Sequence, residues 1–412
     1  MPESLRDRLK ALGVKTGISS TDPIKVERKF PIGEVLSGDE IHNSFGTTFQ
    51  HQDYYPLGYL HGNTTLDQPI GLEIIARWAR TLNLENLQSD SLLFLDTETT
   101  GLNGGTGTYV FLAGIGYQTS QGFTVKQFFL QDPAEEAAFL TALSEAISDF
   151  KGIVTYNGKS FDIPILKTRF ILNGLTPPFS PLGHIDLLHL ARRLWKYRLA
   201  QRNLGILETE ILEMVRSSDE IPGWMIPEMY IDYIRSGDAR PLKGVFYHNA
   251  MDIVSLAAVL VRISRLISDG DHSDEFEGSE IMAAGELHQT LGRNTEAESF
   301  FITAAEKPME KYHLLLNRRK MAEMYRKSAN WDKAIPILVE LADNGLWEAC
   351  CDLAKYYEHT ARDFDQAVRY SQMGIVIVQK AEITNSIREA AQADFNRRME
   401  RLVKKANRNA KS

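Results

Sequence analysis

Residues 92–102 read Leu-Leu-Phe-Leu-Asp-Thr-Glu-Thr-Thr-Gly-Leu, and this stretch decides the fold that we expect. Four consecutive apolar residues bounded by polar ones are typical of a buried strand, which here ends in two acids, Asp96 and Glu98. Because side chains two apart in a strand point to the same face, the two carboxylates would repel each other while losing hydration. A divalent cation or a shared proton would relieve that repulsion. The metal hypothesis therefore requires further acids from later in the chain.

Length and composition indicate a globular protein. With 412 residues, 43% of them hydrophobic and 24% charged, the chain suggests two or three domains. The net charge of −8 means that any nucleic-acid binding depends on a local basic patch. The two cysteines, Cys350 and Cys351, are adjacent, which favours buried reduced thiols over a disulfide or a zinc site. No apolar run is long enough to span a membrane and the first residues have no signal core, so we expect a cytoplasmic protein.

The pattern before and after the acidic strand outlines an α/β domain. Residues 1–90 have no strong period at first, and we expect an N-terminal extension that packs on or near the next domain. Strand-like runs follow at 109–117, 123–130 and 152–156, with a helix between the last two that opens at Asp132-Pro133. The glycine-rich loop at 101–108 lacks the lysine and hydroxyl ending of a phosphate loop, which favours a simple turn beside the acids.

A third acid, Asp162, follows the turn signal Asn157-Gly158. Its position suits the N-cap of a helix that runs to about Phe170, and an aspartate there can also turn an oxygen toward a metal. The sequence leaves these two roles evenly matched.

The fourth acid, Asp252, lies on an apolar-striped helix that includes Ile253, Leu256 and Leu260. At about 100° per residue, a residue four positions earlier lies about 40° from Asp252 on the helix, and one five positions earlier about 140° away. His248 is therefore the better candidate to work beside Asp252, with Tyr247 as the alternative.

A basic segment interleaved with aromatic residues supplies the local patch that an acidic protein needs for phosphates. A solvated helix face is the simpler interpretation of such a run, and the two are compatible because a helix packs one side and presents the other. The candidate side chains are Arg192, Arg193, Lys196 and Arg198.

The ordered acids, with Phe161 before the third and an aromatic or histidine before the fourth, resemble the DEDD superfamily of 3′ to 5′ exonucleases. The resemblance covers about residues 91–265. The glycine-threonine loop and the run Tyr247-His248-Asn249-x-x-Asp252 look most like the bacterial YprB-like branch of ribonuclease-H-like proteins. It implies a ribonuclease-H-like domain at 91–270, with a mixed five-stranded sheet and flanking helices.

Carried over by position, the resemblance implies metal ligation by Asp96, Glu98, Asp162 and Asp252. Two Mg²⁺ or Mn²⁺ ions would cancel the repulsion among them, generate the attacking hydroxide and stabilise the leaving oxygen. His248 or Tyr247 would handle the water, although the two subclasses of the superfamily place these residue types in the reverse order. Candidate contacts to the nucleic acid are Thr99, Gly101, Asn157 and the basic residues of the patch.

The pattern of residues 279–412 predicts helices only, and the last of these helices is basic. Small residues at Gly285 and Ala297, and again at Ala322 and Ala334, resemble positions of a tetratricopeptide repeat. A third, looser unit runs through Ala367, and an irregular helical bundle is the alternative. The basic helix is a solvated tail or a source of nonspecific phosphate contacts.

The leading hypothesis is a metal-dependent 3′ to 5′ exonuclease acting on a DNA or RNA strand with a 3′ end, whose repeats bind a protein partner. One alternative is an interaction protein whose repeats do the work while the nuclease-like domain binds nucleic acid with little turnover. Another is a structure-specific endonuclease on the same fold.

Overall fold

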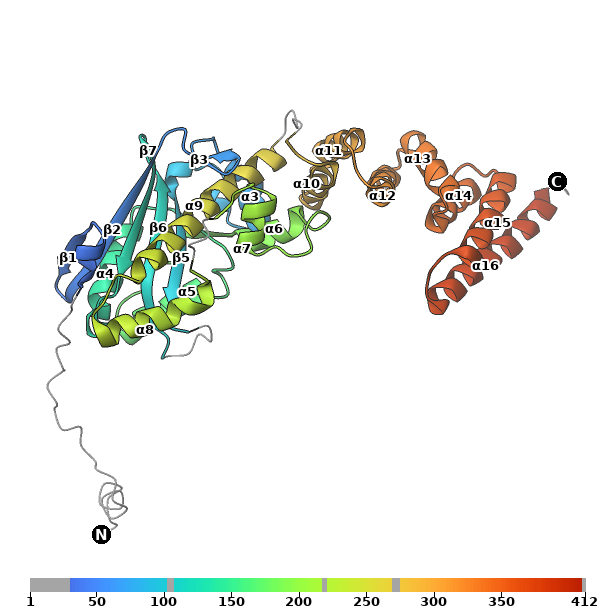
Figure 1. Ribbon diagram of the computed structural model, residues 1–412. Helices are drawn as coiled ribbons and strands as arrows, with labels where there is room; N and C mark the ends of the chain where they lie inside the picture. Colours follow the sequence, from blue (N-terminus) through green and yellow to red (C-terminus); the bar gives the residue numbers. More distant parts are fainter. Residues whose placement is uncertain (1–29, 102–106, 217–220, 269–274, 410–412) are drawn as a thin grey trace, which may run out of the picture.

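The computed structural model describes residues 30–101, 107–216, 221–268 and 275–409. An α/β part is followed by a row of paired helices that leads away from it (Figure 1). Most of the glycine-rich loop, residues 102–106, and the first 29 residues lie outside the described ranges.

A mixed sheet forms the centre of the α/β part, with the strand order β1-β2-β7-β6-β5-β8-β9. Strands β5, β8 and β9 run parallel to one another, whereas the neighbours from β5 to β1 pair antiparallel. The mixed sheet with flanking helices is the fold class that the sequence predicted. The strands are β1 (Asp39–Asn43), β2 (Gly46–Pro56), β5 (Leu92–Thr99), β6 (Val110–Gln118), β7 (Gly122–Phe129), β8 (Gly152–Thr155) and β9 (Gly183–Asp186).

Residues 91–270 contribute the five predicted strands, β5 to β9, but in the described residues the sheet has seven. Strands β1 and β2 come from the segment predicted as an extension, and β2 pairs with β7 from Phe49 opposite Phe129 to Pro56 opposite Gly122. The middle of β2 carries His51, Gln52 and Asp53, so its polar composition hides the strand pattern. A separate two-stranded sheet follows, made of β3 (Leu60–His61) and β4 (Thr64–Thr65).

Helices cover both faces of the large sheet (Figure 1). The alternation along β5 shows why: Leu92 and Phe94 belong to one apolar core, and Leu93 and Leu95 to the other. All four are buried, as expected for a central strand. The helices of this part are α2 (Ile32–Val35), α3 (Leu72–Ala79), α4 (Glu136–Ile147), α5 (Asp162–Leu172), α6 (Leu187–Leu194), α7 (Leu204–Glu210), α8 (Ile226–Ser236) and α9 (Leu242–Ile267).

The second part consists of helices that contact one another in consecutive pairs. The small residues singled out in the sequence lie one on each partner of a pair: Gly285 and Ala297 on the first, Ala322 and Ala334 on the second. A Cβ added to Gly285 would lie 3.0 Å from both Phe300 and Phe301, so the small residue permits the close packing. The helices are α10 (Gly278–Thr290), α11 (Asn294–Glu306), α12 (Lys311–Lys327), α13 (Trp331–Asp343), α14 (Trp347–His359), α15 (Phe364–Lys380) and α16 (Asn385–Asn409).

In the described part of the chain, no helix is both long and apolar enough to cross a membrane. Both cysteines are free thiols on α14, and Cys350 is fully buried.

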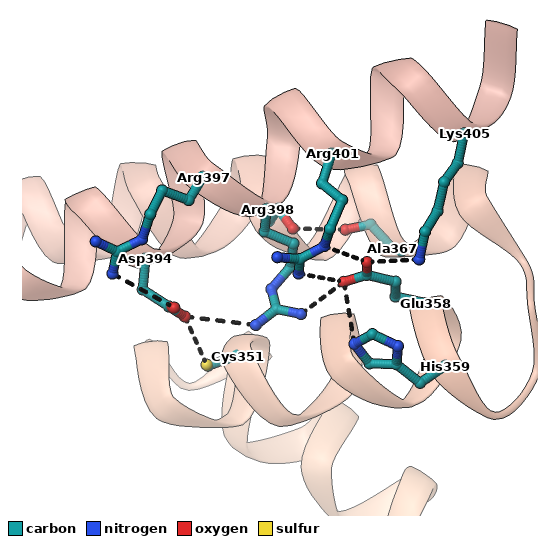
Figure 2. A network of polar contacts seen from close by, with 10 residues as sticks. Cys351, Glu358, His359, Ala367, Asp394, Arg397, Arg398, Arg401 and Lys405 are labelled. Atoms are coloured by element: carbon teal, nitrogen blue, oxygen red, sulfur yellow. Dashed lines mark hydrogen bonds and ion pairs between the residues drawn. The ribbon is translucent and has the colours of Figure 1, made fainter.

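The basic last helix, α16, is held by a buried carboxylate on α14 (Figure 2). The Glu358 side chain is 0% exposed and accepts hydrogen bonds from Arg398 at 2.8 Å, Arg401 at 2.6 Å and Lys405 at 2.9 Å. Burial by itself would raise the pKa of Glu358, but the hydrogen bonds from Arg401 and Lys405 outweigh burial and lower the pKa to about 2. These three cations therefore have a structural role, whereas Arg397 remains mostly exposed.

Replacing Glu358 with glutamine should weaken the packing of α16 by about 3 kcal/mol, because Arg398 would keep its buried charge without the carboxylate that compensates it. Hydrogen exchange of α16 amides at pH 7 measures the loss. Because the folded pKa is depressed below the ordinary 4.5, the stabilisation is present above about pH 4.5 and is lost as the pH falls toward 2.

The matched control is Glu389→Gln, since Glu389 is an exposed acid on α16 itself. The control should leave exchange unchanged. Equal protection of α16 in wild type and Glu358→Gln would show that the ion cluster does not hold the helix.

Candidate active site

Strand β5 delivers Asp96 and Glu98 at its carboxyl end, next to β6 on one side and β8 on the other. Both acids are partly buried, as are Thr97 between them and Thr99 after them. The carboxyl ends of β5 and β8 coincide because these strands are parallel, and segments that follow the two strands meet at this edge.

Helix α9 lies unusually close to β6 where it passes the acids. Gly114 pairs with Asp96 across the sheet, and a Cβ added to Gly114 would lie 2.2 Å from Oδ1 of Asn249. A Cβ at Gly116 would lie 2.4 Å from Ile253 on the same helix. Side chains larger than hydrogen at these two places would push α9 away from the sheet.

The close approach brings Asn249 against Asp96. The Asn249 amide donates to Oδ2 of Asp96 at 2.8 Å, and its own oxygen accepts from Gln127 at 2.8 Å. The Asn249 amide is thus held by side chains of β5 and β7, and Gln127 is itself fixed because it also donates to the Phe246 carbonyl. Asn249 belongs to the motif around the fourth acid but had no predicted role, and Gln127 was not predicted.

Asp162 is the first residue of α5 and reaches the site from the opposite side of β5. The cap interpretation does not fit the helix, because the N-cap residue is Phe161, which makes no side-chain capping bond. The Asp162 carboxylate instead accepts a hydrogen bond from the Thr97 hydroxyl at 2.6 Å. Thr97 thus ties the third acid to the strand that carries the first two.

Burial raises the pKa values of Asp96, Glu98 and Asp162, and the charges of neighbouring acids raise them further. Desolvation is the largest cause for Asp96, followed by the charges of Asp252, Glu98 and Asp162, while the hydrogen bond from Asn249 opposes them. Desolvation also raises the pKa of Glu98, and the charges of Asp252 and Asp162 add to it. For Asp162, burial raises the pKa to about 6 although the bond from Thr97 lowers it. Asp162 and Asp252 are therefore near enough to Asp96 and Glu98 to disfavour the ionised forms of these two acids.

Helix α9 runs through both predicted water-handling positions. His248 lies beside the fourth acid, with 3.6 Å between its Nε2 and Oδ2 of Asp252. Tyr247 is 43% exposed and lies near Tyr55 and Tyr59 of the N-terminal segment. The helical angle thus places histidine and tyrosine as the sequence suggested, with His248 next to Asp252.

A buried ion pair behind Asp252 was not foreseen from the sequence. Arg216 binds Asp252 directly and forms two parallel hydrogen bonds with Glu208 of α7, whose side chain is 1% exposed. A cavity of about 400 Å³ adjoins the pair and is lined by Arg216, His248 and Asp252 together with residues of the 204–205 and 221–223 segments. No local pattern in the sequence identifies this cluster of three, since Glu208 lies on α7, Arg216 in the segment after it and Asp252 on α9.

Carboxylate oxygens are the donors that Mg²⁺ and Mn²⁺ prefer, and the raised pKa values show a site in which a cation would relieve repulsion. Within the described ranges, however, no group of three or more His, Cys, Asp or Glu side chains is arranged to hold a metal ion. Asp252 gives an oxygen to Arg216, and Asp162 gives one to Thr97. The donor set fits a hard divalent cation in its chemistry, with Asp96, Glu98, Asp162 and Asp252 as the candidate ligands.

Three of the residues predicted to contact nucleic acid, Thr99, Gly101 and Asn157, make local contacts in the loops beside the acids. Thr99 donates its hydroxyl hydrogen to the carbonyl of Gly101 at 3.0 Å. Asn157 has a φ of 63°, in the left-handed region, and its backbone N–H donates to Asp186 at 2.8 Å. These contacts shape the loops after β5 and β8, on the edge where the acids lie.

Three of the four basic candidates bind the helical part. Arg193 donates to the Glu286 carbonyl at 3.0 Å, Lys196 lies 2.5 Å from the Glu286 carboxylate, and Arg198 pairs with Glu280 at 3.1 Å. We expected these side chains to be available to phosphates. The sequence alone could not show that α10 packs on α6 and engages them. Arg192 is exposed, and no hydrogen bond or ion pair with the helical part is found for it among the described residues.

Comparison with known proteins supports the architecture. Residues 93–264, which include all four acids and His248, match the RNase H superfamily model. The uncharacterised protein YprB of Bacillus subtilis (strain 168) is 33% identical over 332 residues, covering 78% of this chain and 78% of that protein. The chain therefore belongs to the YprB family and contains an RNase H superfamily domain.

Proposed function

We propose that this protein is a metal-dependent 3′ to 5′ exonuclease that hydrolyses phosphodiester bonds in DNA or RNA. The observation that carries the proposal is the convergence of four acids at the carboxyl edge of β5, where burial raises the pKa of Asp96 and Glu98 and the charges of Asp252 and Asp162 raise it further. Without a cation, the charged carboxylates would repel one another. That repulsion could then be relieved only if some of the acids stayed protonated and neutral. Membership of the RNase H superfamily supports a hydrolase that acts on nucleic acid.

In the proposed mechanism, Asp96, Glu98, Asp162 and Asp252 would hold Mg²⁺ or Mn²⁺ ions, which would supply activation of the attacking water and charge stabilisation of the leaving 3′ oxygen. Asn249 fixes the orientation of Asp96, and Thr97 fixes that of Asp162. His248 orients or deprotonates the attacking water, a role for which its place beside Asp252 favours it over Tyr247. Thr99, Gly101, Asn157 and Arg192 remain the candidates for contact with the strand, and the helical part for contact with a protein partner.

Replacing Asp96 with asparagine should abolish metal-dependent hydrolysis while the chain stays folded. We expect a loss of more than about 100-fold in rate, because even the loss of an outer partner of a metal ligand costs roughly 10–100-fold. The measurement is digestion of 5′-labelled linear and circular DNA and RNA with Mg²⁺ or Mn²⁺. A ladder of shortened linear products with intact circles is the expected result.

The control is Asp90→Asn, an exposed acid just before β5, which should keep full activity. Cleavage of the circular substrates would show that the protein is an endonuclease and not an exonuclease. A wild-type protein that binds labelled strands and cleaves none of them would instead support an interaction protein.

Replacing Asp162 with asparagine should stabilise the metal-free protein at neutral pH. The folded pKa of Asp162 is raised from 3.8 to about 6, so the native state binds more protons and its stability falls as the pH rises between these values. In chelator, the unfolding temperature of the variant relative to wild type should therefore increase from pH 4 to pH 6. Added Mg²⁺ or Mn²⁺ should stabilise wild type more than the variant. A difference that does not change with pH or with either ion would contradict the assignment of Asp162 as a ligand.

A further inference from the structure

The Arg216 guanidinium lies between three functional groups at the edge of the site. Its Nε donates to Oε2 of Glu208 at 2.6 Å, and Nη2 contacts both Oε1 of Glu208 and Oδ1 of Asp252. Its Nη1 lies 3.3 Å from Nδ1 of His248. One rigid cation thus contacts both the proposed ligand Asp252 and the proposed water-handling residue.

Arg216 is anchored from behind by a buried polar chain. Ser255 of α9 donates its hydroxyl hydrogen to Oε1 of Glu208 at 2.5 Å. Because that hydrogen is then committed, the Ser255 oxygen accepts from Nε2 of His61, which lies 2.8 Å away on β3. Glu208, Ser255 and His61 are all buried, so the anchor is fixed by packing as well as by hydrogen bonds.

The contact with Arg216 also determines the protonation pattern of His248. A guanidinium has only donors, so Nδ1 of His248 must act as the acceptor. In the neutral ring the proton then lies on Nε2, the nitrogen that faces Oδ2 of Asp252 at 3.6 Å. The His248 lone pair is engaged by Arg216, and the ring presents an N–H group on the Asp252 side.

We propose that Arg216 is a positioning residue for hydrolysis, which holds His248 in the Nε2–H tautomer and fixes the orientation of Asp252. This role rests on the proposed nuclease function and deepens it. With its lone pair committed to Arg216, His248 orients the water or the scissile group as a donor and does not remove the proton. Glu208 supports this role because its two hydrogen bonds fix the orientation of the guanidinium plane.

The test compares Arg216→Lys with Arg169→Lys. Arg169 forms a second buried, two-bond pair with Glu136, at 2.5 Å for each bond, and this pair contacts none of the four acids. Lysine keeps the charge in both variants but cannot form the planar two-bond contact, so both proteins should lose stability. Only Arg216→Lys should lose kcat, by roughly 10–100-fold with KM changed less than about threefold.

A second readout does not depend on activity. Histidines labelled with ¹⁵N in the imidazole ring report their tautomer by NMR, and the His248 signal is identified by its absence in His248→Gln. Wild type and Arg169→Lys should show His248 in the Nε2–H form, and Arg216→Lys should show a mixture of tautomers. The spectrum of the wild type alone tests the inference if Arg216→Lys fails to fold.

The outcomes separate the two proposals. An active wild type with an unchanged kcat in Arg216→Lys, or with Nδ1 of His248 protonated in the neutral ring, overturns the role of Arg216 and leaves the nuclease function intact. A wild type that hydrolyses no strand overturns the nuclease function, and the positioning role in hydrolysis with it. Loss of kcat together with the change of tautomer, both absent from Arg169→Lys, supports the inference.

Discussion

Repulsion among four carboxylates at the end of one buried strand is the constraint around which the α/β part is built. Each acid that loses water has to be compensated, and here the burial of Asp96 and Glu98 raises their pKa values before any neighbour is counted. The surroundings oppose the repulsion with single, directed contacts: Asn249 on Asp96, Thr97 on Asp162 and Arg216 on Asp252. A fold that only needed stability would remove such acids, so their retention is the strongest physical argument for a function at this edge.

The close packing of α9 on the sheet connects the backbone to this electrostatic arrangement. Gly114 and Gly116 let the helix approach β6, and that approach is what brings the Asn249 amide within hydrogen-bond distance of Asp96. The same helix carries His248 and Asp252 one turn apart. Its position therefore places three site residues at once, namely His248, Asn249 and Asp252. A small movement of α9 would therefore disturb several site residues together.

The sequence predicted the parts of the site that depend on local periodicity. The alternation of β5 placed Asp96 and Glu98 together, and the helical angle placed His248 next to Asp252. The Arg216–Glu208 pair escaped prediction because it joins α7 to the irregular segment after it, where no periodicity applies, and β2 escaped because its middle is polar. The glycine-threonine loop and the run from Tyr247 to Asp252 also indicated the YprB family, whereas the cap position of α5 differs by one residue from the expected one.

The basic segment after β9 has contacts within the chain that its sequence pattern did not reveal. Its aromatic and basic side chains do form a binding surface, but the acids of α10 occupy it: Trp195 donates to Glu280 at 2.7 Å, and Tyr197 to Glu286 at 2.7 Å. Burial raises the pKa of Glu286, yet its bonds with Lys196 and Tyr197 prevail and lower it, so this carboxylate stays charged within the contact. Most of the positive charge of this segment is thus engaged in joining the helical part to the α/β part. In the proposed nuclease, a strand that reaches the four acids would be held mainly by the cations bound there and by exposed residues such as Arg192, so the cations would serve binding as well as chemistry.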